Sequence, residues 1–247
     1  MNRHDGRRPD ELRPYRIEPD YLEQAHGSAL VSCGRTIVLC TASVEDSVPR
    51  WMSGRGKGWM TAEYGMLPAS TGDRTSRESP GGKQKGRTVE IQRLIGRTIR
   101  AVTDFDALGE RTVWLDCDVL QADGGTRTAA ISGAWVAAAR ALDRFGLSRA
   151  LTDSIAAVSL GIVDGELLLD LDYVEDSAAE VDVNIAMTGA AGLVEVQATA
   201  ERAPFNREEL DELLTLAAMG IEEIAEIQRA ASLQPAQLPI SPKGNGQ

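Results

Sequence analysis

The stretch from Trp114 to Leu142 constrains the fold of this chain most, because it reads as a strand, a glycine-rich loop and a helix in direct succession. Apolar residues dominate the strand, and Gly124-Gly125 allows the backbone to turn tightly. An alanine-rich helix opens at Thr126-Arg127-Thr128 and runs to about Leu142. This junction places the positive end of a helix dipole beside flexible backbone, an arrangement that favours a bound anion.

Three residues of this junction are suited to a phosphate group. Gly125 lets the backbone come close to an anion, Thr126 adds a hydroxyl donor, and Arg127 adds a planar fork that fits phosphate. Local chemistry leaves a second interpretation open, an ordinary strand-to-helix turn with a solvated arginine, since short glycine-rich turns are common.

Composition narrows the class of protein. The 247 residues are 43% hydrophobic, as in a globular chain, and no apolar run approaches the length that spans a bilayer. The basic N-terminus is not followed by an apolar segment, so we expect no signal peptide, no membrane partner and a cytoplasmic location. Three widely spaced cysteines and two histidines argue against a disulfide framework, a histidine-based metal centre and a Ser-His-Asp triad.

The charge is unevenly distributed. The net charge is −11, yet residues 50–100 hold 11 Lys and Arg against 4 Asp and Glu, while the rest holds 15 against 33. A basic zone on an acidic body is typical of a face that binds a polyanion. A mixed-charge surface without that role is the alternative.

The hydrophobic pattern divides the chain into two similar halves. Residues 1–14 are arginine-rich and are expected to form an arm, and residues 45–60 and 61–87 are expected to be loops. Strands are predicted at 15–18, at 27–44 as a hairpin turning at Gly34, and at 114–120, 155–163, 166–173, 181–187 and 193–199. Helices are predicted at 88–103, at about 129–142 after the opening residues 126–128, and from the capping residue Asn206 to about Arg229.

This order of elements predicts an α+β fold with two related sheet-and-helix halves. The boundary is expected near 145–155, within a single catalytic domain over 1–231. The proline-containing tail, 232–247, is expected to be disordered.

Basic residues are concentrated in the predicted 61–87 loop and the helix after it. The loop carries Arg74, Arg77 and Arg87, and the helix carries Arg93, Arg97 and Arg100 on one stripe. A solvated helix face is the usual explanation, but the position next to the basic loop favours contact with phosphates.

An acidic cluster lies between two predicted strands in the second half. Asp176 is expected in the loop before the strand, and Asp182 at the strand's start, pointing away from the core. Two such carboxylates suit Mg²⁺, which prefers oxygen ligands and keeps several waters. A solvated acidic loop is the alternative. Together with the phosphate and basic sites, the pair suggests phosphoryl chemistry in which the attacking group is a bound small molecule.

Six stretches of this sequence resemble the ribonuclease PH family of phosphorolytic 3′→5′ exoribonucleases, also called tRNA nucleotidyltransferases. They are DGRRPDELRP (5–14), VLCTASVEDSVP (38–49), GWMTAEYGMLP (58–68), GRTVEIQRLIGRTIRAV (86–102), LDCDVLQADGGTRTAAISGA (115–134) and LDYVEDSAAEVDVNIAMTG (171–189). The resemblance covers roughly residues 3 to 230.

The resemblance implies a ribosomal-protein-S5-domain-2-like fold in a homohexamer, a trimer of dimers. It implies that inorganic phosphate attacks the last phosphodiester of an RNA 3′ end, such as that of a tRNA precursor, reversibly releasing a nucleoside 5′-diphosphate. The family's phosphate site falls on Arg87, Gly125, Thr126 and Arg127, its acidic pair on Asp176 and Asp182 as Mg²⁺-holding groups, and its tRNA-gripping arginines on Arg74 and Arg77. Arg93 and Arg97 are expected to guide the RNA, and Ala69 stands where some members carry a further arginine.

Two other functions remain as alternatives. A non-catalytic RNA-binding ring subunit of an exosome-like assembly would lack part of the phosphate or acidic set, which this chain keeps. A small-molecule kinase would need a glycine-rich loop around ATP and would leave the basic zone without a purpose.

Overall fold

The first half of the chain forms a five-stranded sheet. The computed structural model describes residues 3–78, 84–202 and 204–235, so residues 79–83 of the predicted 61–87 loop and residues 236–247 of the predicted tail lie outside the described residues. The strand order is β1-β2-β3-β5-β4, with β4 parallel to β5 and the other pairs antiparallel. The strands are β1 (Tyr15–Pro19), β2 (Gly27–Cys33), β3 (Thr36–Glu45), β4 (Trp59–Met66) and β5 (Thr112–Gln121).

The second half forms an antiparallel four-stranded sheet with the order β7-β6-β8-β9. Its strands are β6 (Ile155–Val163), β7 (Glu166–Leu169), β8 (Val181–Thr188) and β9 (Leu193–Ala200). Every residue of β6 is buried, because helices cover both faces of this central strand. Alternate residues of β8 therefore enter two different cores, and Asp182, Asn184 and Ala186 lie on the face turned toward the first half.

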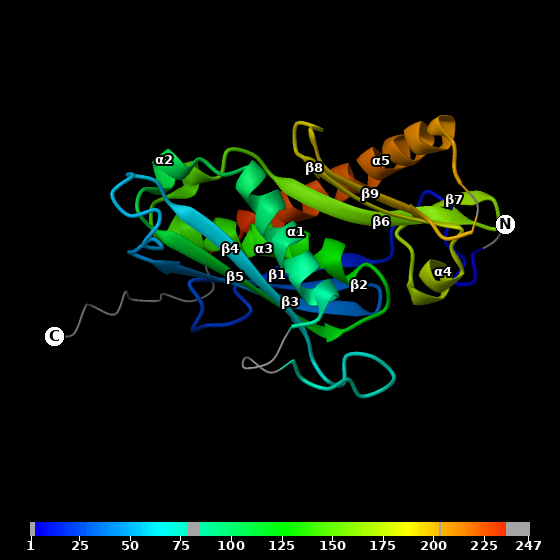
Figure 1. Ribbon diagram of the computed structural model, residues 1–247, viewed down its shortest axis with the longest axis horizontal. Helices are drawn as coiled ribbons and strands as arrows, with labels where there is room; N and C mark the ends of the chain where they lie inside the picture. Colours follow the sequence, from blue (N-terminus) through cyan, green and yellow to red (C-terminus); the bar gives the residue numbers. More distant parts are fainter. Residues whose placement is uncertain (1–2, 79–83, 203, 236–247) are drawn as a thin grey trace.

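The helices are α1 (Gly86–Ala101), α2 (Phe105–Leu108), α3 (Thr126–Arg144), the 3₁₀ turn η1 (Ser148–Ala150), α4 (Tyr173–Ala178) and α5 (Arg207–Ser232). Helix α3 lies between the two sheets, and α5 covers the opposite face of the second sheet (Figure 1). Alanines along α3 bring both sheets close to its backbone, so nearly the whole helix is buried. The N-terminus of α3 is thereby fixed at the junction of the two halves.

Most predicted elements are confirmed, including the hairpin at Gly34, helices α1, α3 and α5, and the cap of α5 at Asn206. Two loops were predicted wrongly. Residues 59–66 form strand β4, in which Met60, Ala62 and Tyr64 point into the core. The alternation was obscured by polar residues on the solvent face and by the glycines and proline on either side.

The predicted 166–173 strand is too long, and Asp176 lies in helix α4 rather than in a loop. Asp172 ends the extended segment because its side chain accepts from the backbone N–H groups of Val174 and Glu175. Glu175 returns a bond to the N–H of Asp172, which completes a capping box. The four residues Asp172 to Glu175 carry this signal in the sequence.

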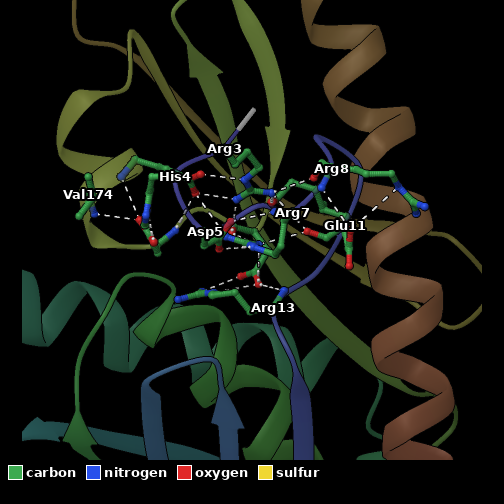
Figure 2. Close-up of polar contacts among 12 residues, drawn as sticks. Arg3, His4, Asp5, Arg7, Arg8, Glu11, Arg13 and Val174 are labelled. Carbon is green, nitrogen blue, oxygen red and sulfur yellow. Dashed lines mark hydrogen bonds and ion pairs between the residues drawn. The ribbon is translucent and has the colours of Figure 1, made fainter. Parts of the chain in front are cut away.

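Residues 3–14, predicted as an arm, are packed against the second half of the molecule (Figure 2). Leu12 joins the core formed by the second sheet and α5. The backbone N–H of Leu169 donates to the carbonyl of Pro9, which ties this segment to β7 before the chain enters β1.

Candidate functional site

The glycine loop, residues 123–126, connects β5 to α3 with two consecutive residues in the left-handed region. Gly124 has φ 74° and Gly125 has φ 65°. A Cβ on Gly124 would lie 2.6 Å from the carbonyl oxygen of Leu171, so a side chain there would collide with the backbone of the second half. The glycines therefore serve both the turn and the close approach of the two halves.

The glycine loop is held by side chains of the first sheet. The Thr36 hydroxyl donates to the carbonyl of Gly124 at 2.7 Å and accepts from the N–H of Asp123 at 2.9 Å. Arg35 forms an ion pair with the Asp123 carboxylate at 3.0 Å. These contacts fix the free N–H groups at the start of α3, as an anion site requires.

Tyr64 of β4 also contacts the glycine loop. This residue was not predicted from the sequence as part of the site, because strand β4 was not predicted. Its hydroxyl donates to the Thr126 hydroxyl at 2.9 Å, which leaves the Thr126 hydrogen free to donate to an anion. Burial raises the pKa of Tyr64, while the charges of Arg87 and Arg127 lower it. Both guanidinium groups therefore act electrostatically on the Tyr64 hydroxyl beside Thr126.

Arg127 points from the first turn of α3 toward β9. Its side chain is 13% exposed and lies 3.8 Å from a carboxylate oxygen of Glu90, and its Nη1 donates to Gln197 at 2.7 Å. Gln197 in turn donates to Glu90 at 3.0 Å, so two groups from different halves orient the guanidinium. Arg87 lies exposed in the first turn of α1.

The structure places Asp176 on α4 and Asp182 on β8 within electrostatic reach of both arginines. Burial raises the pKa of Asp176, and the charges of Arg127 and Arg87 oppose it. Burial also raises the pKa of Asp182, and the negative charge of Asp176 raises it further, against the opposing charge of Arg127. Asp182 accepts one hydrogen bond from Asn184 at 3.3 Å.

The acidic pair, Asp176 and Asp182, suits a divalent cation. Mutual repulsion and partial dehydration are the conditions that a bound cation relieves, and two carboxylates with water fit the preference of Mg²⁺. Within the described residues, no cluster of three or more His, Cys, Asp or Glu side chains forms a closed metal cage. The residues present therefore fit an open Mg²⁺ site.

The arginines predicted to contact RNA differ in whether their side chains are exposed or already bound to other protein groups. Arg74 and Arg77 are exposed on the segment after β4, and Arg93 is exposed on α1. Arg97 is engaged by Glu195 of β9 at 2.8 Å. Arg100 leaves the predicted stripe, since its guanidinium covers the Trp59 ring at 5.1 Å and donates to the carbonyl of Met60.

Comparison with known proteins decides the family. Residues 11–142 match domain 1 of the 3′ exoribonuclease family, and residues 153–220 match its domain 2. This chain belongs to the 3′ exoribonuclease family. A ribonuclease PH of Rhodospirillum rubrum is 56% identical over 231 residues, which cover 92% of this chain and 96% of that protein. These matches confirm the predicted family and its activity, phosphate-dependent 3′→5′ exoribonuclease.

Solved structures confirm the predicted fold for this family member. Rice Rrp46 superposes with a TM-score of 0.76 at 20% identity, covering 93% of this chain and 100% of that one. An Archaeoglobus fulgidus exosome with RNA bound to the active site gives 0.76 at 24% identity, covering 91% and 92%. The fold is thus the α+β, ribosomal-protein-S5-domain-2-like fold. Across the described residues, no helix is both long and apolar enough to span a membrane.

Proposed function

We propose that this chain trims the 3′ ends of tRNA precursors and other RNAs at a site built from Arg87, the glycine loop, Arg127 and the acidic pair. The observation that carries the proposal is a convergence at the junction of the halves. Two arginines from α1 and α3 act electrostatically on the same two carboxylates, which lie on α4 and β8. A binding scaffold has no need to hold repelling carboxylates beside an anion site, so this convergence favours catalysis over the ring-subunit alternative.

In the proposed mechanism, Arg87, Arg127 and the N–H groups of Gly125 and Thr126 hold inorganic phosphate in line with the terminal phosphodiester. A phosphate oxygen forms the new bond to phosphorus as the bond to the 3′-oxygen breaks, releasing a nucleoside 5′-diphosphate and a new 3′-hydroxyl end. Positioning and charge stabilisation are the protein's contribution. Because one phosphoryl bond replaces another, the reaction also runs backward and adds nucleotides.

Asp176 and Asp182 are the residues that hold Mg²⁺ in this proposal. The bound ion supplies compensation for the negative charge on the scissile group and the leaving oxygen. Both aspartates keep a fixed place because they lie on regular elements, α4 and β8, rather than on loops.

The RNA approaches over the basic surface in this proposal. Arg74, Arg77 and Arg93 are exposed and contact phosphates, which position the strand without reading its sequence. Arg97 joins them by exchanging its Glu195 partner for a phosphate. We also propose that the protein is cytoplasmic and assembles as a homohexamer, a trimer of dimers. Light scattering measures the mass of this assembly directly.

The deciding experiment incubates the purified protein with a 3′-extended tRNA precursor and Mg²⁺, with and without inorganic phosphate, and resolves the released nucleotides. We expect nucleoside diphosphates only when phosphate is present. Monophosphates independent of phosphate would indicate hydrolysis and contradict the mechanism. No release would bring the scaffold alternative forward.

A further inference from the structure

The N-terminal strap, residues 3–14, contacts the second half of the chain at the base of α4 (Figure 2). Arg3 is buried, with its side chain 1% exposed, and its guanidinium forms a two-pronged pair with Glu175 at 2.7 and 2.6 Å. It also donates to the carbonyls of Leu169 and Asp170 at 2.8 and 3.0 Å. Glu175 immediately precedes Asp176, so Arg3 fixes the helical turn that carries one member of the acidic pair.

Arg13 ends the strap and contacts both halves. Its Nε and Nη2 donate to the two oxygens of Asp170 at 2.9 and 2.6 Å, and its own backbone N–H donates to Asp170 at 2.8 Å. Its Nη1 donates to the carbonyl of Asp123 in the glycine loop at 2.5 Å. A Cβ on Gly125 would lie 3.0 Å from Nη2, so the guanidinium lies directly against the glycine loop.

We infer that Arg13 is a positioning residue, whose guanidinium holds the glycine loop of the first half in register with the α4 segment that carries Asp176. The proposed site is divided between the two halves, and a constellation of this kind needs its parts held within about 0.5 Å. Only a planar fork spans two carboxylate oxygens and a carbonyl at once, which a lysine ammonium cannot do.

The strap makes this link independent of the core between the sheets. Arg3 anchors α4, Arg13 joins the segment before α4 to the glycine loop, and both donate to Asp170. Both side chains are buried, and every guanidinium nitrogen of each donates to a protein oxygen. Their role is therefore to place the reacting groups.

The molecule contains a matched control away from the proposed site. Arg140 on α3 is also buried and pairs in a two-pronged way with Asp20, and it donates to the carbonyls of Ser232 and Gln234. Asp20 and Asp170 both adopt a positive φ, 56° and 54°. Arg140→Lys therefore removes the same kind of contact as Arg13→Lys, near the end of α3 that lies away from Thr126 and Arg127.

The test measures steady-state phosphorolysis and thermal unfolding for the wild type, Arg13→Lys and Arg140→Lys. We expect Arg13→Lys to raise KM for phosphate and lower kcat, with kcat/KM for phosphate falling about 10²-fold, as for a misplaced site, and KM for RNA unchanged. Arg140→Lys should lower the unfolding temperature by a similar amount with kinetics per folded molecule unchanged. Wild-type kinetics in Arg13→Lys would overturn the inference, because lysine keeps the charge and loses only the fork.

A second variant keeps the inference testable if Arg13→Lys does not fold. Arg3→Lys loosens α4 and the segment before it but removes no contact with the glycine loop. We therefore expect a fall in kcat of about tenfold, on the same positioning argument, with KM for phosphate unchanged. Equal kinetics in Arg3→Lys and the wild type would contradict the strap's role. The inference rests on the proposed site, and Arg127→Ala separates the two failures: if Arg127→Ala is active, the site itself is wrong.

Discussion

Two sets of carboxylates lie within thirteen residues of one another and have opposite surroundings. Asp170 and Glu175 are buried and paired with arginines of the strap, and hydrogen bonds and charge from Arg13 outweigh burial to hold the pKa of Asp170 below its ordinary value. Asp176 and Asp182 form no ion pair within the described residues, and burial holds their pKa values above the ordinary value.

The difference separates carboxylates that stabilise the fold from carboxylates that we assign to the proposed site. A buried carboxylate with a fork of donors is satisfied and fixes the chain around it. A partly buried carboxylate beside a like charge costs stability, and such perturbed groups are typical of functional sites. The strap thus holds in place α4, the helix that carries Asp176 of the acidic pair.

The strongest test of this comparison removes the Arg127 guanidinium, whose positive charge acts on both members of the acidic pair. Arg127→Ala should lower phosphate-dependent cleavage by about 10³-fold or more, because it deletes both a phosphate ligand and a compensating charge. Assembly should be intact by light scattering. Release of labelled nucleoside diphosphate by the variant at the wild-type rate would remove Arg127 from the site.

Asp182→Asn should lower activity by about 10²- to 10³-fold, the range seen when one electrostatic partner of a reacting group is removed. RNA binding, measured by filter retention, should be unchanged, because the exposed arginines are untouched. A variant that loses RNA affinity and keeps its chemistry would show that Asp182 belongs to the binding surface.

Asp170→Asn should instead lower the free energy of unfolding by about 3 kcal/mol, because it leaves the buried guanidinium of Arg13 without its counter-charge. Urea denaturation measures this loss. Asp10→Asn is the control, since Asp10 is 47% exposed in its pair with Arg8 and should cost under about 1 kcal/mol. Equal stability of the two variants would mean that the strap does not hold the fold.

The smallest expected effect is on the pH dependence of the free energy of unfolding, measured without added metal. The folded pKa of Asp182 is raised, so its contribution to stability is present below the unfolded pKa and is lost as the pH rises through the folded one. Asp182→Asn should therefore be more stable than the wild type at pH 7, by about 0.5–1 kcal/mol, and lose this advantage in acid. A variant less stable at pH 7 would show that the native carboxylate is satisfied.

Periodicity and local chemistry predicted most elements of the fold because those signals lie within short stretches. The hairpin at Gly34, the strand–loop–helix predicted at 114–142 and the capped α5 were all recognisable in this way. Strand β4 was not, because its solvent face is polar and turn residues flank it. Helix α4 was not predicted because its six residues are too few to show a helical periodicity, and the capping box is its only sequence signal.

The sequence by itself determined the family, the two-half plan and the chemical types present at the site, because glycine turns, arginine forks and paired carboxylates are local properties. Only the tertiary structure decided which of these distant residues contact one another. Arg13 and Asp123 are 110 residues apart, and Arg127 and Gln197 are 70 apart, yet each pair is in hydrogen-bond contact. Such contacts depend on how the two sheets pack against α3, and that packing arises from the whole core rather than from any one stretch.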